Sequence, residues 1–469
     1  MNHRLAGDAI IVNTPFDELT IGAQAELTRL CREEDIFVFA NASGNHNPAH
    51  LPNADHDGDG VVDAPLAPSL WVASLVSAVL GNQLPGPGTL YKSQTLSFLG
   101  HARVGDELIA RVRLTEKGEN RLAVFDTTVE TSDGLPILAG TAQVIAPEFP
   151  VSYDRTGLPA LTVRRHAHFD RLLARAEPLE PIRTAVVVPE SGDSLAGALL
   201  AARHTLITPI LVGDRERIMR TAAAIGADLS GIRIEQADDS DAAAARSVAM
   251  VHDGLVDALM KGHLHTDELL RHVVKRDGGL RTARRLSHAF VMDVPGLDHL
   301  LTISDAAINI APDLDAKIDI IQNAIELAAA MGVYMPRVAV LSAVETVNAK
   351  IPSTVDAAAL SKMAERGQIT GGFVDGPLAM DNAVSEEAAR AKGIRSTVAG
   401  TADILICPDL ESGNMIAKQL TYLAHAEAGG IVLGARCPII LNSRSDNDQA
   451  RLASCAIAAL HHNRAARPR

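Results

Sequence analysis

From Arg183 onward the chain alternates short apolar runs with segments of helical character, and this rhythm restricts the fold more than any other feature. The apolar runs are residues 184–190, 207–212, 259–260, 338–341, 404–407 and 431–433. Short, continuous apolar runs separated by helices are typical of parallel strands that are buried on both faces. The sequence therefore predicts an α/β domain whose mainly parallel sheet is covered by helices.

The first part of the chain follows a different pattern. One strongly apolar segment of mostly small residues, 69–80, predicts a buried helix. Four strand-like runs follow this helix, at 90–99, 107–115, 121–131 and 137–145. One helix followed by a meander of long strands predicts an α+β domain in which a sheet wraps around the helix.

Three prolines, Pro147, Pro150 and Pro159, lie among polar residues between these two patterns and indicate a linker. A chain of 469 residues is too long for one ordinary core, so more than one domain is expected in any case. The sequence predicts an N-terminal domain at 1–146, a linker at 147–165 and a C-terminal domain at 166–469.

Composition excludes several classes of protein. A net charge of −14 argues against binding to nucleic acid, which needs a basic face. No apolar run approaches the ~20 residues of a membrane span, and no signal peptide is seen. The four cysteines have no metal-type spacing, and Cys407 and Cys437, which lie in apolar strand-like runs, are expected to be buried, reduced thiols. We therefore expect a cytoplasmic protein with no membrane partner.

Several motifs occur in a fixed order near the C-terminus: VDGPLAMD from Val374, AGTADILICPDLESGNMIAK from Ala399, and GARCPIILNSR from Gly434. In this order they resemble the phosphate acetyltransferase and phosphate butyryltransferase family, over residues 165–461. The stretches MKGHLHTDELLR and ISDAAINIAPDLDAKIDIIQNA support the resemblance, and the likeness is closer to the butyryl members. The resemblance implies an α/β phosphotransacylase domain with two subdomains around a cleft.

The resemblance also implies a reaction, the movement of a short acyl group between coenzyme A and inorganic phosphate. The site would need a phosphate clamp, an oxyanion donor and a base. Family likeness assigns the reacting centre to Ser443 and Arg444, with Arg444 holding phosphate charge through its two-pronged guanidinium. The acetyl members use an aspartate shortly after this pair as a proposed base. Asp446 and Asp448 are available here, although neither has the expected spacing, and either one can instead cap the following helix.

A wider set of residues is expected to bind phosphate or coenzyme A. The loop at Lys261 is predicted to join a strand to a helix and to receive an anion at the helix start, or to be an ordinary cap with a solvated lysine. Asn414 is predicted to lie in a turn before a helix, where it contacts substrate or closes the turn. The full predicted set is Lys261, Gly262, Thr266, Arg284, Arg285, Ser287, His288 and Asn414.

The expected substrates are acyl-CoA, inorganic phosphate and acyl phosphate, with coenzyme A as substrate and no required cofactor. A related fold that has lost activity is an alternative, and so is a catalytically silent acyl-CoA sensor that regulates a partner.

FANASGNHNPAHL, from Phe39, and GHARVGDEL, from Gly100, resemble the MaoC-type (R)-specific enoyl-CoA hydratases of the hotdog fold. Active members pair an aspartate with a histidine to add water to an enoyl thioester. Here His50 stands at the histidine position, but Asn45 replaces the aspartate, and an amide is a poor base. The domain is therefore a hydratase, an acyl-CoA-binding module or a dimerisation domain. If it is a hydratase, the alternative function of the whole chain is an (R)-specific enoyl-CoA hydratase with a scaffold C-terminal domain.

Hotdog domains generally pair through their sheets, so the resemblance also implies a homodimer or a higher homo-oligomer. The segment DHDGDGVVD resembles a calcium loop without its final bidentate carboxylate. A solvated acidic loop is the alternative, so no metal is expected. The four carboxylates in the positions of calcium ligands are Asp55, Asp57, Asp59 and Asp63.

Overall fold

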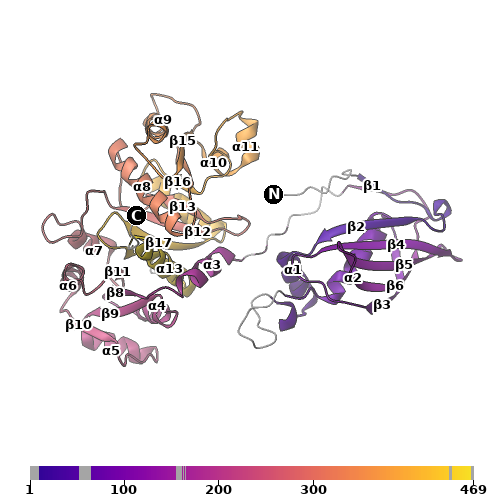
Figure 1. Cartoon of the computed structure of the whole chain (residues 1–469), viewed down its shortest axis with the longest axis horizontal. Helices are drawn as coiled ribbons and strands as arrows, with labels where there is room; N and C mark the ends of the chain where they lie inside the picture. The colour runs from indigo at the N-terminus through magenta and orange to yellow at the C-terminus, as the bar shows by residue number, and fades with distance from the viewer. Residues whose placement is uncertain are drawn as a thin grey trace. The chain divides into compact units, whose positions relative to one another are not determined.

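The computed structural model describes residues 10–51, 65–154, 161, 163, 165–442 and 446–465. The chain divides into two compact units, Met1–Val163 and Arg164–Arg469, and each is described by itself (Figure 1).

The N-terminal unit is one antiparallel sheet around one helix. Its five strands are ordered β2-β4-β5-β6-β3. Its helices are α1 (Glu33–Ser43) and α2 (Ser69–Asn82), with 3-10 turns at Phe16–Glu18 and Pro48–His50. Its strands are β2 (Gln24–Leu30), β3 (Leu90–Phe98), β4 (Glu107–Lys117), β5 (Leu122–Thr131) and β6 (Pro136–Ile145), and a separate pair joins β1 (Ile10–Val12) to β7 (Ser152–Asp154).

The hydrophobic core of this unit lies between α2 and the sheet. Alternate residues of β4 and β5 are buried, as expected for strands with one face on a core. Val72, Val76 and Val79 of α2 pack in the same cluster as Leu108 and Phe125 of these strands. The predicted helix at 69–80 and the predicted sheet around it are confirmed.

The C-terminal unit is built on an eleven-stranded sheet with the order β10-β9-β8-β11-β18-β17-β12-β13-β16-β14-β15. Its strands are β8 (Ile182–Val187), β9 (Ile207–Gly213), β10 (Arg233–Gln236), β11 (Ala258–Lys261), β12 (Ser287–Asp293), β13 (Leu301–Ser304), β14 (Arg337–Leu341), β15 (Phe373–Leu378), β16 (Ile404–Ile406), β17 (Glu427–Leu433) and β18 (Ile439–Ile440). Its helices are α3 (Ala167–Ala176), α4 (Gly192–Arg203), α5 (Arg215–Ala224), α6 (Ser240–His252), α7 (Thr266–Val273), α8 (Leu314–Ala330), α9 (Pro352–Glu365), α10 (Met380–Val384), α11 (Glu386–Ala391), α12 (Leu410–Leu423) and α13 (Asp448–Ala465).

Helices cover both faces of this sheet, so successive residues of one strand are buried against different helices. In β11, Met260 packs in the cluster that contains residues of α3, α4 and α13, whereas Leu259 packs in the cluster that contains residues of α6 and α7. Successive side chains of a strand point to opposite faces, so these two groups of helices lie on opposite faces. The prediction of a mainly parallel, helix-covered sheet is confirmed.

The middle of the sheet is antiparallel, which the apolar rhythm did not reveal. β17 contains the run 431–433 and is antiparallel to both of its neighbours, β12 and β18. Only residues 434–438 connect β17 to β18, and a link this short joins antiparallel strands, whereas a parallel pair needs a long crossover. β12 and β13 are antiparallel as well. Two parallel halves therefore run in opposite directions on either side of the centre.

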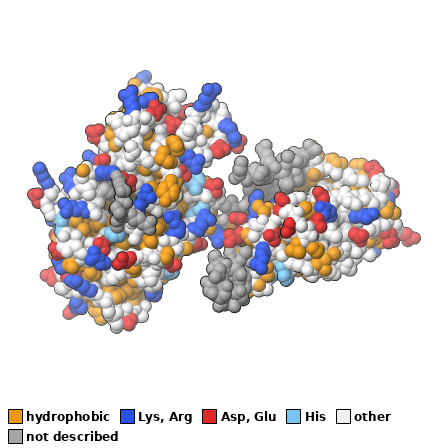
Figure 2. All heavy atoms as spheres, viewed as in Figure 1, with side chains coloured by type: hydrophobic (Ala, Val, Ile, Leu, Met, Phe, Trp, Pro, Cys, Tyr) orange, Lys and Arg blue, Asp and Glu red, His pale blue; other side chains and the backbone are white. Residues whose placement is uncertain are grey.

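The surface agrees with the acidic composition. Figure 2 shows acidic and basic side chains interspersed over the visible face of each unit, and no continuous basic stripe among the described residues of that face. Within the described part of the chain, none of the helices combines the length and the apolar character that a membrane crossing requires.

Candidate active site

Two of the predicted segments meet at one edge of the sheet. β11 and β18 are parallel neighbours, with Leu259 opposite Ile439 and Met260 opposite Ile440. The carboxyl ends of both strands therefore lie at the same edge, and the loop after β11 and the segment after β18 leave the sheet side by side. Nearly 180 residues separate these segments in the sequence, so only the fold brings them together.

This edge is also a switch point of the topology. β8 lies between β9 and β11, so the chain turns to one side of β8 first and to the other side later. Ligands of open α/β sheets bind at such a point, outside the carboxyl ends of the strands. Val188, which follows β8 here, has a φ of +56°, a strained conformation for a β-branched residue. Strain of this kind is concentrated at functional sites.

The loop after β11 depends on a glycine. Gly262 donates its N–H to Val187 O at 2.9 Å, and a Cβ at this position would lie 2.4 Å from Val188 O. His263 N donates to Val188 O at 2.7 Å, which ties the loop to the end of β8. Thr266 then begins α7, as the predicted strand-to-helix loop requires.

Lys261 is not a solvated lysine. It is only 7% exposed, and its Nζ lies 3.4 Å from Gly262 O and 3.3 Å from Leu264 O. These two carbonyl oxygens of the loop accept hydrogen bonds from the ammonium group. A positive charge therefore lies near the start of α7, where the helix dipole also favours an anion. The alternative of a solvated lysine is excluded by this burial.

Ser443 and Arg444 lie outside the described residues. On the C-terminal side, Asp446 accepts a hydrogen bond from Arg451 Nε through its backbone oxygen at 3.3 Å. Asp448 is exposed in the first turn of α13. The expectation that one of these aspartates caps the helix through its side chain is not met, because Asn447 Oδ1 accepts from Ala450 N at 2.8 Å. The role of either aspartate as a base stays a prediction.

The predicted contacts at residues 284–287 lie at the opposite end of the central strands. Arg285 adjoins the turn after β17, where a Cβ on Gly434 would lie 2.3 Å from Arg285 O. Extending the β17–β18 register beyond Ile431 and Ile440 sets Asn442 opposite Gly429. Five residues of strand separate Gly429 from Gly434, or about 17 Å. The structure therefore does not bring Arg284, Arg285 and Ser287 to the edge where β18 ends. The His288 ring does reach the level of Leu441, since a Cβ on Gly430 would lie 3.2 Å from His288 Nε2 and 2.4 Å from Leu441 O.

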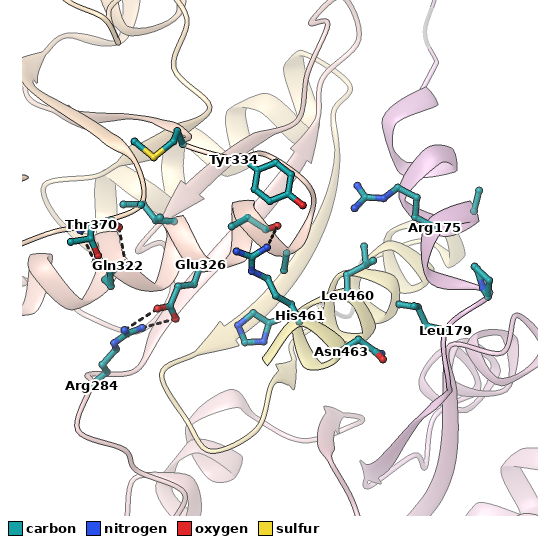
Figure 3. Close-up of a pocket in the computed structure, with 18 residues that line it drawn as sticks. Arg175, Leu179, Arg284, Gln322, Glu326, Tyr334, Thr370, Leu460, His461 and Asn463 are labelled. Carbon is teal, nitrogen blue, oxygen red and sulfur yellow. Dashed lines mark hydrogen bonds and ion pairs between the residues drawn. The ribbon is translucent and has the colours of Figure 1, made fainter. Parts of the chain in front are cut away.

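Two of these side chains have partners of their own. Arg284 forms a two-pronged ion pair with Glu326, at 2.6 and 2.9 Å (Figure 3). Arg285 extends its guanidinium toward Asn309 Oδ1 at 3.4 Å, a weaker contact. Arg284 is thus largely committed to a carboxylate, while Arg285 keeps most of its donors.

Ser287 and His288 are interior residues. Ser287 is fully buried and accepts a hydrogen bond from Asn323 Nδ2 at 3.0 Å. His288 is 2% exposed, and its burial lowers its pKa to about 4, against a weaker opposing effect of Asp305. The imidazole is therefore neutral at neutral pH. A direct phosphate contact by either residue remains a prediction that their burial does not favour.

Asn414 is the fifth residue of a helix and does not lie in a turn that precedes one. α12 begins at Leu410, with Asp409 as its N-cap: Asp409 Oδ1 accepts from Ser412 N at 2.8 Å. The expected helix start was too late because Asp409 was not recognised as the cap. Asn414 Nδ2 donates to Ala306 O at 3.1 Å, so its amide fixes the loop after β13.

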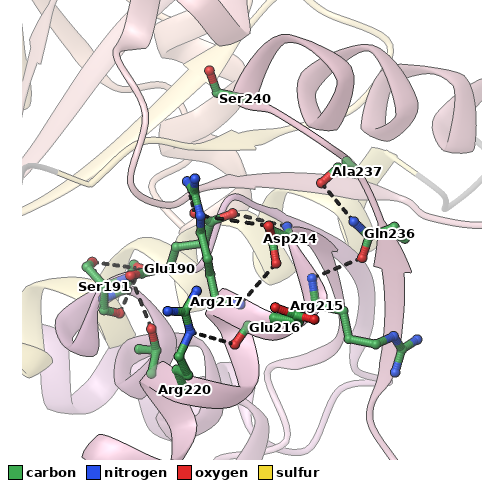
Figure 4. Close-up of polar contacts among 12 residues, drawn as sticks. Glu190, Ser191, Asp214, Arg215, Glu216, Arg217, Arg220, Gln236, Ala237 and Ser240 are labelled. Carbon is green, nitrogen blue, oxygen red and sulfur yellow. Dashed lines mark hydrogen bonds and ion pairs between the residues drawn. The ribbon is translucent and has the colours of Figure 1, made fainter.

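Sequence reasoning missed two residues at the edge of β8, β11 and β18. Asn442, directly before Ser443, is 3% exposed, and within the described residues neither polar atom of its amide has a hydrogen-bond partner. Glu190 ties the loops after β8 and β9 together, accepting from Asp214 N at 3.1 Å and from Arg217 Nη1 at 3.3 Å (Figure 4). Asn442 was recognisable as a polar residue at the end of an apolar run, while Glu190 gave no such signal.

In the N-terminal unit, His50 closes a 3-10 turn and is oriented by the backbone. Its Nδ1 lies 3.0 Å from Leu66 O. Because a carbonyl oxygen only accepts, Nδ1 carries the proton and Nε2 is left with its lone pair. Asn45 is exposed, and its Oδ1 accepts from Asn47 N at 3.2 Å. The orientation of His50 suits a base, whereas the Asn45 amide serves a local turn.

Metal and thiol chemistry have little support in the described residues. Among the residues that the structure describes, no three His, Cys, Asp or Glu side chains are grouped so that they could hold a metal ion. Asp55, Asp57, Asp59 and Asp63, the possible calcium ligands, lie outside the described residues. All four cysteines are buried and free, as was expected for Cys407 and Cys437, and burial raises the pKa of each thiol to about 12.

The two units match two families. Residues 239–459 match the family model described as phosphate acetyl/butaryl transferase, and residues 17–134 match the model described as MaoC like domain. A branched-chain phosphotransacylase from Enterococcus faecalis, known from a crystal structure, is 29% identical with a TM-score of 0.53, over 60% of this chain and 99% of that one.

Curated relatives cover the C-terminal unit. A phosphate acetyltransferase of Rhizobium meliloti is 59% identical over 62% of this chain and 93% of that protein. A phosphate butyryltransferase of Clostridium beijerinckii is 43% identical over 62% of this chain and 97% of that protein. The expectation of a closer likeness to butyryl members is therefore wrong for these two relatives. With a MaoC-like hotdog domain at its N-terminus, the chain belongs to the phosphate acetyl/butyryltransferase family.

Proposed function

We propose that this chain moves a short acyl group between coenzyme A and inorganic phosphate. The observation that carries the proposal is the shared edge of β11 and β18, where the buried Lys261 and the start of α7 adjoin the segment that leads to Ser443 and Arg444. A buried cation and a helix N-terminus at a topological switch point suit an anionic substrate. The family of the relatives agrees with this chemistry.

In the proposed reaction, the thiol of coenzyme A loses its proton and the sulfur attacks the carbonyl carbon of the acyl phosphate. A C–S bond forms, the C–O bond to phosphate breaks, and the proton passes to the departing phosphate. Arg444 holds the phosphate charge, and Ser443 orients the thiol or stabilises the oxyanion of the tetrahedral intermediate. Lys261 adds positive charge near the N-terminus of α7. The base is Asp446 or Asp448 in this scheme.

The architecture proposed for the whole chain is a hotdog domain at 1–146, a linker at 147–165 and the acyltransferase at 166–469. We propose a cytoplasmic homo-oligomer that uses coenzyme A as a substrate and needs no other cofactor. Light scattering at micromolar concentration tests the assembly, and a monomer would contradict it.

A direct assay tests the activity. Purified full-length protein is mixed with acyl-CoA of two to six carbons and with phosphate, and a thiol reagent reports released coenzyme A. Hydroxylamine traps the acyl phosphate as a hydroxamate, which identifies the product. Omission of phosphate and the Arg444→Ala variant are the controls. An absence of phosphate-dependent release with every acyl-CoA would contradict the proposal, and tight acyl-CoA binding without turnover would favour a sensor. The chain-length profile gives the preferred substrate.

A second activity is proposed for the N-terminal unit, the hydration of a short 2-enoyl-CoA. What favours it is the match of residues 17–134 to the MaoC like domain, together with a His50 that is oriented by Leu66 O. Loss of the ultraviolet absorbance of crotonyl-CoA measures hydration. Hydration without phosphate-dependent release would assign the C-terminal unit a scaffold role.

A further inference from the structure

A cavity of about 1240 Å³ lies among α3, α8 and α13 in the C-terminal unit (Figure 3). Its apolar lining includes Leu179, Ile325 and Leu460. Arg175, Arg464 and Tyr334 also line it, and Arg175 and Tyr334 are labelled in Figure 3. This volume exceeds that of a typical small-molecule site, which has an apolar lining and a few placed polar groups.

The cavity is separate from the edge at which β11 and β18 end. Helix α13 begins next to that edge at Asp448, and the cavity is lined by its other end, from Leu460 onward. Twelve helical residues separate the two positions, or about 18 Å at 1.5 Å per residue. A ligand that lies against Leu460 is therefore far from the edge at which β11 and β18 end.

The charges around the cavity are unbalanced toward positive. Glu326 is the carboxylate in the lining, and Arg284 engages both of its oxygens. Burial lowers the pKa of His461 to about 4, so its imidazole is neutral. Among the described residues, no carboxylate lies within ion-pair distance of Arg175 or Arg464. Arg175 and Arg464 are both exposed, so water solvates their guanidinium groups when no ligand is bound, and both are accessible to an anion.

Both guanidinium groups keep donors available. Arg175 donates to Met331 O, and Arg464 donates to Ala329 O at 3.0 Å, so each uses one N–H at the C-terminal end of α8. A guanidinium has five N–H donors in a planar fork, which matches carboxylate and phosphate oxygens. Arg464 also lies 5.8 Å from the centre of the Tyr334 ring, and Tyr334 is 75% exposed.

One polar atom in the lining also lacks a partner. His461 Nδ1 is buried and has no hydrogen-bond partner among the described residues. The atom is enclosed by the protein itself, so a ligand in the cavity does not contact it, and recognition of a ligand rests on the other lining groups. Apolar walls and two guanidinium groups with available donors thus occur in one cavity.

We propose that this cavity binds an organic anion with an apolar body, whose carboxylate or phosphate head contacts Arg175 and Arg464 while the body lies against Leu179, Ile325 and Leu460. The site is distinct from the acyl-transfer site, and its existence does not depend on the proposed reaction.

Four probes of matched size test the two halves of this ligand. Octanoate and octyl phosphate carry both body and head, octanol lacks the charge, and inorganic phosphate lacks the body. Ligand-detected NMR titration of the full-length protein measures each dissociation constant. We expect octanoate or octyl phosphate to bind at least about tenfold more tightly than octanol and inorganic phosphate, because charge-assisted hydrogen bonds and apolar burial both contribute. The stronger of the two identifies the head group.

Variants locate the binding. Arg175→Gln with Arg464→Gln should weaken the anionic probes at least about tenfold and leave octanol unchanged. Ala174→Trp, which fills the cavity without removing a charge, should weaken octanoate, octyl phosphate and octanol alike. Arg390→Gln, at an exposed arginine on α11 outside the cavity, is the matched control. Equal binding of octanol and the anions by the wild type, or undiminished binding by Ala174→Trp, would overturn the proposal.

Discussion

Gly262 lies so close to Val188 that a methyl group on its Cα would approach the Val188 carbonyl oxygen to 2.4 Å and the Val187 carbonyl oxygen to 2.5 Å. Val187 ends β8 and Val188 follows it, and both oxygens already accept hydrogen bonds from the loop after β11. The spacing between these two strand ends is therefore set by the absence of a side chain at one position.

The first prediction follows from this contact. Gly262→Ala should destabilise the C-terminal unit by about 2–4 kcal/mol, because backbone atoms cannot move aside as a flexible side chain would. Acyl transfer should fall as well, since Lys261 lies on the same loop. Chemical denaturation and the assay measure the two effects. Gly81→Ala is the control: it lies in α2 with no atom within 4 Å of a new Cβ, and alanine should stabilise that helix by about 0.5–1 kcal/mol. A Gly262→Ala protein with wild-type stability would show that the loop can relax.

The second prediction concerns Arg444. Arg444→Ala should lose about 2–4 kcal/mol of transition-state stabilisation if the guanidinium clamps developing charge. Arg444→Lys should recover only part of the rate, because lysine lacks the two-pronged fork. The ratio of kcat/KM values between variant and wild type gives the energy. Unchanged turnover in the lysine variant would argue against a bidentate role.

Ser443 gives the third prediction. Ser443→Ala should lower kcat while the melting temperature stays close to the wild-type value, because a small hydroxyl is replaced by a smaller group. Steady-state kinetics and thermal unfolding are measured on the same preparation. Wild-type kinetics would remove Ser443 from the mechanism.

The fourth prediction is a pH dependence of stability. Burial lowers the pKa of His288 in the folded protein from its ordinary value of 6.5 to about 4. The unfolded chain therefore binds a proton that the folded chain does not between these two values, so stability is present above pH 6.5 and is lost as the pH falls toward 4. The loss is about 1.4 kcal/mol per pH unit for one such group. Denaturation at several pH values measures this slope, and His288→Gln should reduce it by about one proton. An unchanged slope would mean that other groups dominate the acid unfolding.

The fifth prediction concerns the N-terminal unit. Asn45→Asp should create or raise hydration of crotonyl-CoA, because a carboxylate then joins His50, whose Nε2 is free to act. Folding should survive the change, since the aspartate oxygen can still accept from Asn47 N. His50→Ala in the Asn45→Asp background should abolish the gain. Hydration by the unaltered protein that is lost in His50→Ala would instead show that Asn45 is no defect.

The sequence predicted the kinds of element well but not the directions of all strands. The helix at 69–80 and the meander after it are reproduced closely, because their apolar periods differ clearly. An apolar run does not encode strand direction, so the run at 431–433 gave no sign that β17 is antiparallel to its neighbours. The short connection to β18 contained that information, since five residues are too few for a parallel crossover.

The candidate site was predicted in parts. The loop at Lys261 was expected between a strand and a helix, and it is found there. Its proximity to the segment after β18 depends on strand order, which a single sequence does not determine. Because the strand order was not known from the sequence, Arg284 was grouped with residues from which the fold separates it. The cap of α13 was misassigned because Asn447 lies between two aspartates, and all three residue types are good caps.

The sheet order also affects how the protein is made. β18 lies between β11 and β17, and β17 lies between β18 and β12, so both inserted strands come from the last tenth of the chain. Before ribosomal synthesis reaches Glu427, β11 and β12 would each present an unpaired edge, which is a template for aggregation. The N-terminal unit has all its strands once residue 154 is made. The first unit can therefore fold during translation, whereas the second must await nearly the complete polypeptide.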